Sequence, residues 1–131
     1  MTSIYLIYLL FHCLTFIYSL DDDTPLIKAA SRNMYNVVKA LVNEFKADYT
    51  LTENNGETAL HCAISVHGFK IAMFLLGLPN IDVNAVANRT ITPLMLCALF
   101  NTNESLQIAQ RLVELGADVD HQGDECYEGY R

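Results

Sequence analysis

The chain has 131 residues and a formal net charge of −7 at pH 7, because 15 acidic residues oppose 8 basic ones. This length is enough for one domain with a modest core. The negative balance argues against nucleic acid, whose phosphates attract Lys and Arg, and against an anionic membrane surface. It favours a protein partner that carries a basic patch.

The first 19 residues form an apolar leader. Residues 1–20 contain no Lys, Arg, Asp or Glu, and residues 4–17 are almost entirely apolar. A membrane-spanning helix needs about 20 such residues, so this shorter stretch predicts a signal peptide that is cleaved after Ser19, and a secreted protein. The leader departs from the usual signal peptide in having three tyrosines and no basic residue. Two alternatives stay open: an uncleaved membrane anchor, or a buried helix of the fold or misassigned gene start.

One phrase occurs three times in the rest of the chain. Its copies begin at Thr24, Thr58 and Thr92, which are 34 residues apart. Each copy predicts the start of a helix, because threonine caps a helix well and Pro or Ala suits the first turn. Apolar residues at helical spacing predict a second helix in each unit, over residues 36–42, 69–76 and 106–115. A period in the low thirties predicts a stack of helix pairs.

The signature phrase, the paired apolar residues of each second helix and a tip such as Gly-Ala-Asp-Val at 116–119 recur in the same order. This pattern closely resembles the ankyrin repeat, in which a turn leads to two antiparallel helices. The resemblance covers residues 20–120 and implies an all-α ankyrin-repeat solenoid with short β-like finger tips. Its three units are about 20–52, 53–86 and 87–120, and residues 121–131 form a tail or a truncated repeat.

Three irregularities set the units apart. Lys28 stands at a site that faces the preceding repeat, so we expect it to meet water at the end of the stack. Gly56 supplies the left-handed backbone of one turn, whereas Thr90 stands at that place in the next, which predicts a strained turn. The third unit has three extra residues, which we place between its helices at residues 101–104.

The C-terminal end of the stack has no polar capping repeat. We therefore expect the outward face of the third unit to expose some of Leu96, Ile108, Leu112 and Leu115. Three explanations stay open: residues 121–131 fold back as a cover, the face docks on something, or the gene is truncated.

No residue pattern predicts catalysis or metal binding. His61 and Cys62 are neighbours on a helix and point about 100° apart, so they do not form a nucleophilic pair. The resemblance makes His61 the signature histidine that ties a turn to its neighbour. Cys62 and Cys97 are expected to be small buried hydrophobes. A zinc site from these residues with His121 and Cys126 lacks the short paired spacing that zinc sites show.

Three asparagines are candidates for modification. Asn88 and Asn103 begin N-glycosylation sequons, which matter only if the domain enters the secretory lumen. Asn84 resembles the asparagine that is hydroxylated in many ankyrin domains. The alternative for Asn84 is a structural, hydrogen-bonding role.

The resemblance implies a monomeric protein-protein interaction module without catalytic activity or cofactor. Alternatives are a membrane-anchored ankyrin adaptor, which touches the membrane only through residues 1–19, and a truncated relic of a longer ankyrin protein. Partners of this family usually meet the concave face of finger tips and first helices. Carried over, the candidate partner-binding residues are Asp21, Asp22, Asp23, Arg32, Asn54, Asn55, Glu57, Val66, Asn88, Arg89, Ile91, Leu99 and Phe100. Of these, Leu99 and Phe100 are the candidate apolar anchors, unless Phe100 merely covers the inserted residues.

Overall fold

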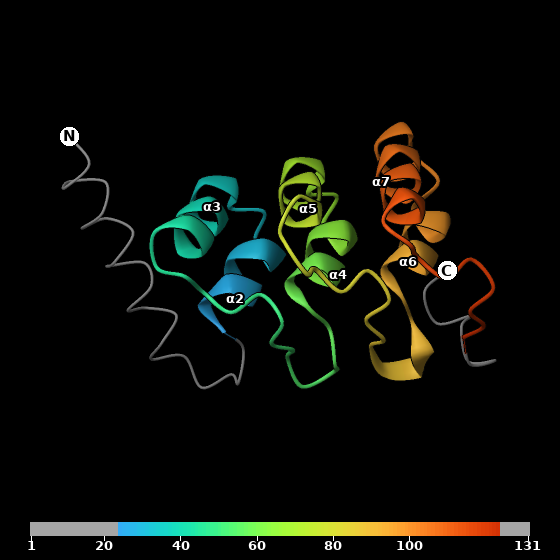
Figure 1. The fold of residues 1–131 in the computed structure, drawn as a ribbon, viewed down its shortest axis with the longest axis horizontal. Helices are drawn as coiled ribbons and strands as arrows, with labels where there is room; N and C mark the ends of the chain where they lie inside the picture. The colour runs from blue at the N-terminus through green and yellow to red at the C-terminus, as the bar shows by residue number, and fades with distance from the viewer. Residues whose placement is uncertain (1–23, 124–131) are drawn as a thin grey trace.

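The computed structural model describes residues 24–123, and these residues form three helix pairs. The pairs are α2 (Pro25–Ser31) with α3 (Tyr35–Asn43), α4 (Ala59–Ser65) with α5 (Phe69–Leu76), and α6 (Pro93–Phe100) with α7 (Asn103–Glu114). A short 3₁₀ helix, η1 (Asn88–Thr90), precedes α6. Figure 1 shows the pairs side by side in a row, with the loops before α4 and α6 projecting to one side as fingers. The predicted all-α stack is confirmed.

The three signature threonines cap the first helices as the sequence predicts. The hydroxyl oxygens of Thr24, Thr58 and Thr92 accept hydrogen bonds from backbone N–H groups three residues later, at 3.2, 3.4 and 3.3 Å. Pro25 and Pro93 occupy the first turn of α2 and α6, where their missing N–H costs nothing. These caps fix where each pair begins and therefore keep the pairs in register.

The core runs continuously along the stack, between and within the pairs. First helices pack on first helices (α2 on α4, α4 on α6) and second helices on second helices (α3 on α5, α5 on α7). Small residues such as Ala29, Ala63 and Cys97 are buried at one repeating position, where they let the helices approach closely. Leu75 and Leu112 are completely buried in the second-helix layer. Burying such a side chain contributes about 1.5–3 kcal/mol.

Each pair turns between its helices through one residue with left-handed backbone. These residues are Asn33 (φ 56°), His67 (φ 59°) and Asn101 (φ 46°), which stand 34 residues apart. Asparagine tolerates this conformation better than most residues. These three connectors lie along one side of the stack, opposite the fingers, and we call that side the loop end.

The three extra residues of the third unit do not form a longer connector, so the prediction of an insertion between the helices is wrong. The connector in that unit is Asn101 and Thr102, and α7 begins at Asn103, as far beyond its signature threonine as α3 and α5 are beyond theirs. The insertion instead lengthens α7 to 12 residues, against 9 in α3 and 8 in α5. Three residues make almost one helical turn, so the helix absorbs them without a bulge.

The predictions for the two ends of the stack have different outcomes. The side chain of Lys28 is only 5% exposed, so the prediction that it meets water is wrong. At the other end, Leu96, Ile108 and Leu112 are buried in the core, and Leu115 is the one of the four predicted residues that is exposed. The other exposed large apolar side chains of the third unit, Leu106, Val113 and Val119, are not among the predicted ones.

Candidate functional site

Finger two, the loop of residues 52–58, is held in shape by the carboxylate of Glu53. Its Oε1 atom accepts hydrogen bonds from the backbone N–H groups of Asn55 at 2.6 Å and Glu57 at 3.0 Å. Gly56 closes the turn with a φ of 76°, and its N–H donates to the Glu53 carbonyl at 2.9 Å. The sequence analysis missed Glu53. The available signal was a carboxylate three residues before the turn glycine.

Finger three, residues 87–92, is joined to finger two through two of the predicted binding residues. The N–H of Asn88 donates to the carbonyl of Asn55 at 2.7 Å, and Asn88 Nδ2 lies 3.5 Å from Asn55 Oδ1. Both residues are exposed, as is Asn54 beside them. The fingers are therefore held at a fixed separation, and they present polar groups in a fixed arrangement.

Thr90 has the strained backbone that the sequence predicts. Its φ is 57°, close to the 76° of Gly56 at the equivalent place, although Thr90 is β-branched. η1 and an isolated β-bridge between Ala87 and Ile91 close this turn. The carbonyl of Thr90 also lies 2.8 Å from His121 Nε2, which connects finger three to the segment beyond α7.

Ile91 does not belong to a binding surface, so this prediction is wrong. Its side chain is 2% exposed because it packs into the core beneath finger three. Its carbonyl oxygen lies 3.0 Å from Nε2 of His61, which is itself completely buried. The predicted structural role of His61, tying one unit to the turn of the next, is thus confirmed.

His61 also completes the cap of α4. The N–H of Thr58 donates to His61 Nδ1 at 3.1 Å, so Nδ1 is an acceptor and Nε2 carries the proton that Ile91 accepts. Burial lowers the pKa of His61, an effect that the bond to the Ile91 carbonyl partly offsets. The imidazole is therefore neutral, and both of its ring nitrogens are occupied by structural hydrogen bonds.

The tips beyond the second helices are linked by Asn84. Its Nδ2 donates to the carbonyl of Gly116 at 3.2 Å, and its Oδ1 accepts from the N–H of Asp118 at 2.7 Å. The side chain is exposed but both of its polar ends are engaged. This arrangement provides the structural, hydrogen-bonding role that the sequence analysis kept as the alternative to hydroxylation.

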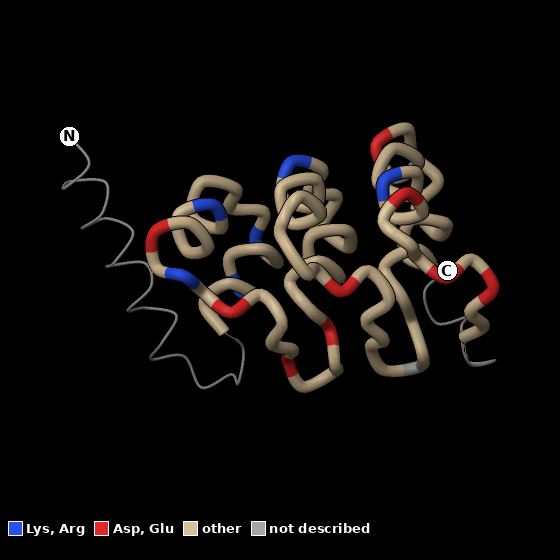
Figure 2. The backbone as a smooth tube through the Cα atoms, viewed as in Figure 1, with Lys and Arg blue, Asp and Glu red and all other residues tan. Residues whose placement is uncertain are grey.

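Negative charge gathers on the fingers and tips, as Figure 2 shows. Over residues 47–58, 81–92 and 116–122 the sequence places six acidic residues and one basic residue, Arg89. The acidic ones are Asp48, Glu53, Glu57, Asp82, Asp118 and Asp120. Hydrogen bonds from Thr50 lower the pKa of Asp48, which favours the charged form of that carboxylate. Of the acidic residues predicted for the binding surface, Glu57 lies among these six, whereas Asp21, Asp22 and Asp23 lie outside the described residues.

The other predicted binding residues lie at the loop end and not with the fingers. Arg32 and Val66 are the C-cap residues of α2 and α4, and Phe100 is the last residue of α6. A first helix of 8 residues is about 12 Å long, so these positions are well separated from the fingers. Leu99 and Phe100 are half-buried, which leaves part of each available for contact. The predicted set therefore divides into two surfaces.

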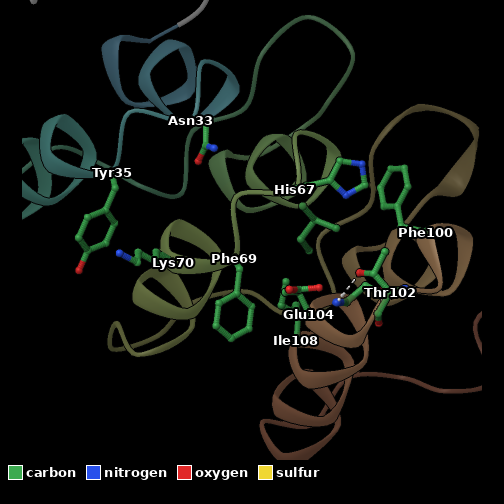
Figure 3. A pocket seen from close by; sticks show the side chains of 11 residues that line it. Asn33, Tyr35, His67, Phe69, Lys70, Phe100, Thr102, Glu104 and Ile108 are labelled. Atoms are coloured by element: carbon green, nitrogen blue, oxygen red, sulfur yellow. Dashed lines mark hydrogen bonds between the residues drawn. The ribbon is translucent and has the colours of Figure 1, made fainter.

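A cleft of about 650 Å³ opens at the loop end, between the second and third pairs and reaching the first. The ring of Phe100 meets the ring of His67 edge to face, with centroids 4.7 Å apart. Figure 3 shows these two rings at one side of the cleft and Phe69 at the other. Thr102 at its edge caps α7 and shares three hydrogen bonds with Ser105. Phe100 thus lines a cavity and does not cover an insertion.

Other candidate groups in the described residues are placed as follows. Cys62 and Cys97 are buried free thiols, as predicted, and burial raises the pKa of Cys97 to about 12. Among residues 24–123, no group of His, Cys, Asp or Glu could hold a metal ion, and no helix is long and apolar enough to span a bilayer. The sequon asparagines Asn88 and Asn103 are exposed. Cys126, the last member of the zinc set, lies outside this range.

Comparison with protein families matches the ankyrin-repeat model of three copies to residues 4–87 and a single ankyrin repeat to residues 91–124. The chain belongs to the ankyrin-repeat family. The two matches together correspond to roughly four repeats, one more than the sequence analysis assigned. The additional repeat reaches into residues 4–19, which were assigned to a leader and lie outside the described residues.

Three curated relatives are similar to this chain over a small part of their own length. It is 32% identical over 104 residues to human Rabankyrin-5, 26% identical over 104 residues to a probable serine/threonine-protein kinase of Dictyostelium discoideum, and 29% identical over 116 residues to the protein lin-12 of Caenorhabditis elegans. These alignments cover 79%, 79% and 83% of the chain but only 9%, 10% and 8% of the relatives. The chain therefore spans about a tenth of the length of the proteins it matches.

Proposed function

We propose that this ankyrin-repeat protein is a monomeric, non-catalytic interaction module. Its acidic fingers bind a partner protein that carries a basic patch. The observation that carries this proposal is the excess of six acidic residues over one basic residue on the fingers and tips. Those loops are fixed by Glu53 and by the Asn55–Asn88 bonds. Loops that are already ordered lose little conformational entropy on binding, which favours affinity.

The residues most suited to chemistry support binding without catalysis. His61 is buried and bonded at both ring nitrogens. The Cys97 thiol is buried, and its raised pKa keeps it from forming the thiolate that acts as a nucleophile. Both groups are buried, so neither is exposed to a substrate as a reactive centre.

Affinity capture with three matched chains tests the acidic face. Glu57→Gln removes one charge from finger two, and Glu44→Gln removes one from the C-cap of α3, away from the fingers. We expect a specific partner to be retained by the wild type and by Glu44→Gln but weakened about three- to tenfold by Glu57→Gln, with binding that falls as salt rises. Equal loss from both variants, or salt-independent binding, would reject the proposal.

Export is a separate proposal that rests on the apolar composition of residues 1–19. If the leader is a cleaved signal peptide, the secreted protein begins at Leu20. An intact Met1 on a membrane-bound protein supports the anchor, and an intact Met1 on a protein without membrane association rejects both. N-terminal sequencing of the protein from its native host, with fractionation, distinguishes these outcomes.

A further inference from the structure

The loop-end cleft crosses the stack and has walls from all three helix pairs. Tyr35 comes from the first pair, Phe69 and Lys70 from the second, and Phe100 and Glu104 from the third. The fingers project from the opposite ends of the first helices, so this cleft is separate from the acidic face. Its volume of about 650 Å³ is in the range of ligand-binding pockets.

The cleft has an apolar floor between aromatic walls. Ile64 and Ile108 form its floor and are 2% and 3% exposed. Phe69 and Phe100 stand over them half-buried, one at each side. A concave apolar site with partly exposed aromatic rings is the setting in which one inserted side chain contributes most of the binding energy.

Two opposite charges stand at the rim. Lys70 and Glu104 belong to the first turns of α5 and α7, and both side chains are exposed. Figure 3 shows them on either side of Phe69, with Lys70 toward Tyr35. Within residues 24–123 neither side chain forms an ion pair, because the salt bridge found in this range joins Arg111 to Glu114. The rim therefore offers one positive and one negative contact along the line of the cleft.

We propose that this cleft binds a short extended peptide segment of a partner protein. The segment inserts an aromatic or large aliphatic side chain between Phe69 and Phe100. It places an acidic residue beside Lys70 and a basic residue beside Glu104. Packed helices lie about 8–10 Å apart, so crossing three pairs takes about 20 Å, which an extended chain of about six residues spans.

Two synthetic peptides of equal composition and opposite order are the probes: acetyl-Glu-Ser-Phe-Gly-Ser-Lys-amide and acetyl-Lys-Ser-Gly-Phe-Ser-Glu-amide. Titration into the full ¹⁵N-labelled chain, followed by NMR, reports binding at the amides of Ile64, His67 and Ile108. Each peptide can match both rim charges in only one backbone direction, so we expect the order whose direction suits the cleft to bind at least about threefold more tightly than the other. We also expect Phe100→Ala to weaken that binding at least about fivefold.

The decisive variant exchanges the two rim charges, Lys70→Glu with Glu104→Lys. Both side chains are exposed, so the fold is kept and the preference between the two peptides inverts. The matched control exchanges Lys39 and Glu44 on the outer surface of the first pair and leaves the preference as in the wild type. An absence of shifts in the cleft, equal binding of both peptides, or a preference that survives the rim exchange would each overturn the proposal.

Discussion

The Nε2 atom of His61 in the second pair lies 3.0 Å from the carbonyl oxygen of Ile91 in the turn of the third. This bond is buried at both ends and joins residues of two successive units that are 30 positions apart in sequence. Because Nδ1 of the same ring accepts from Thr58 N–H, one neutral tautomer serves both the helix cap and the contact between units. The stack therefore depends on the protonation state of one imidazole.

Stability should fall on acidification because the pKa of His61 is lowered in the folded state. The unfolded chain takes up a proton near pH 6.5, before the folded chain does, so the contribution is complete above that pH and is lost as pH falls toward the folded pKa. A protonated Nδ1 would also face the N–H donor of Thr58. Urea unfolding at pH 7.5 and pH 5 should show this loss.

The variant His61→Gln is the control for that measurement. It should cost about 1–3 kcal/mol at pH 7.5, since it leaves buried polar groups without good partners. It should also remove part of the difference between the two pH values. If the wild type and His61→Gln lose the same stability on acidification, His61 is not the group responsible.

Replacing Thr90 by glycine should stabilise the protein by about 1 kcal/mol. Thr90 holds a φ of 57°, where a β-branched side chain is strained and glycine is not. The mirror experiment is Gly56→Thr at the equivalent turn, where φ is 76°, and it should destabilise by at least as much. Thermal unfolding of the two variants checks both signs. A destabilising Thr90→Gly would mean that the contacts of the threonine side chain outweigh the backbone strain.

Asn84→Ala should loosen the contact between the tips. The variant loses one donor to Gly116 and one acceptor for Asp118, and we expect a cost of about 1 kcal/mol because the site is exposed. The backbone N–H of Asp118 should exchange with solvent several times faster, as measured by hydrogen exchange. Asn36→Ala, at an exposed position of α3, should leave that rate unchanged. An unaltered Asp118 rate in Asn84→Ala would refute the link.

The Cys97 thiol should resist alkylation in the folded protein. Burial raises its pKa to about 12, so the reactive thiolate is scarce at pH 8 and the sulfur is also inaccessible. Mass spectrometry after brief iodoacetamide treatment should find Cys97 unmodified in buffer and modified in urea. Rapid labelling in buffer would show that α6 opens on the timescale of the reaction.

Local signals explain what the sequence could predict. The threonine caps, the role of His61 and the strain at Thr90 each depend on a residue type at a fixed place in the repeated pattern. Because the pattern recurs in each unit, one copy supports the assignment made in another. The errors concern features that depend on neighbours in space. Ile91 has a finger position in sequence but packs inward, and Lys28 is polar but buried. A pattern of helical spacing also does not say whether extra residues extend a helix or a loop.

Two leucine variants in α7 test whether the extra residues of the third unit extend this helix. Leu112 is completely buried against α5 and the core, whereas Leu106, at which the sequence analysis began the helix, is 59% exposed. Leu112→Ala should therefore cost about 2–5 kcal/mol, and Leu106→Ala should lie within about 0.5 kcal/mol of the wild type. The two substitutions remove the same atoms from the same helix. The difference between their free energies of unfolding, measured with denaturant, therefore reports the difference in burial. Comparable losses would show that the outer face of α7 is packed, and would contradict the placement of the extra turn.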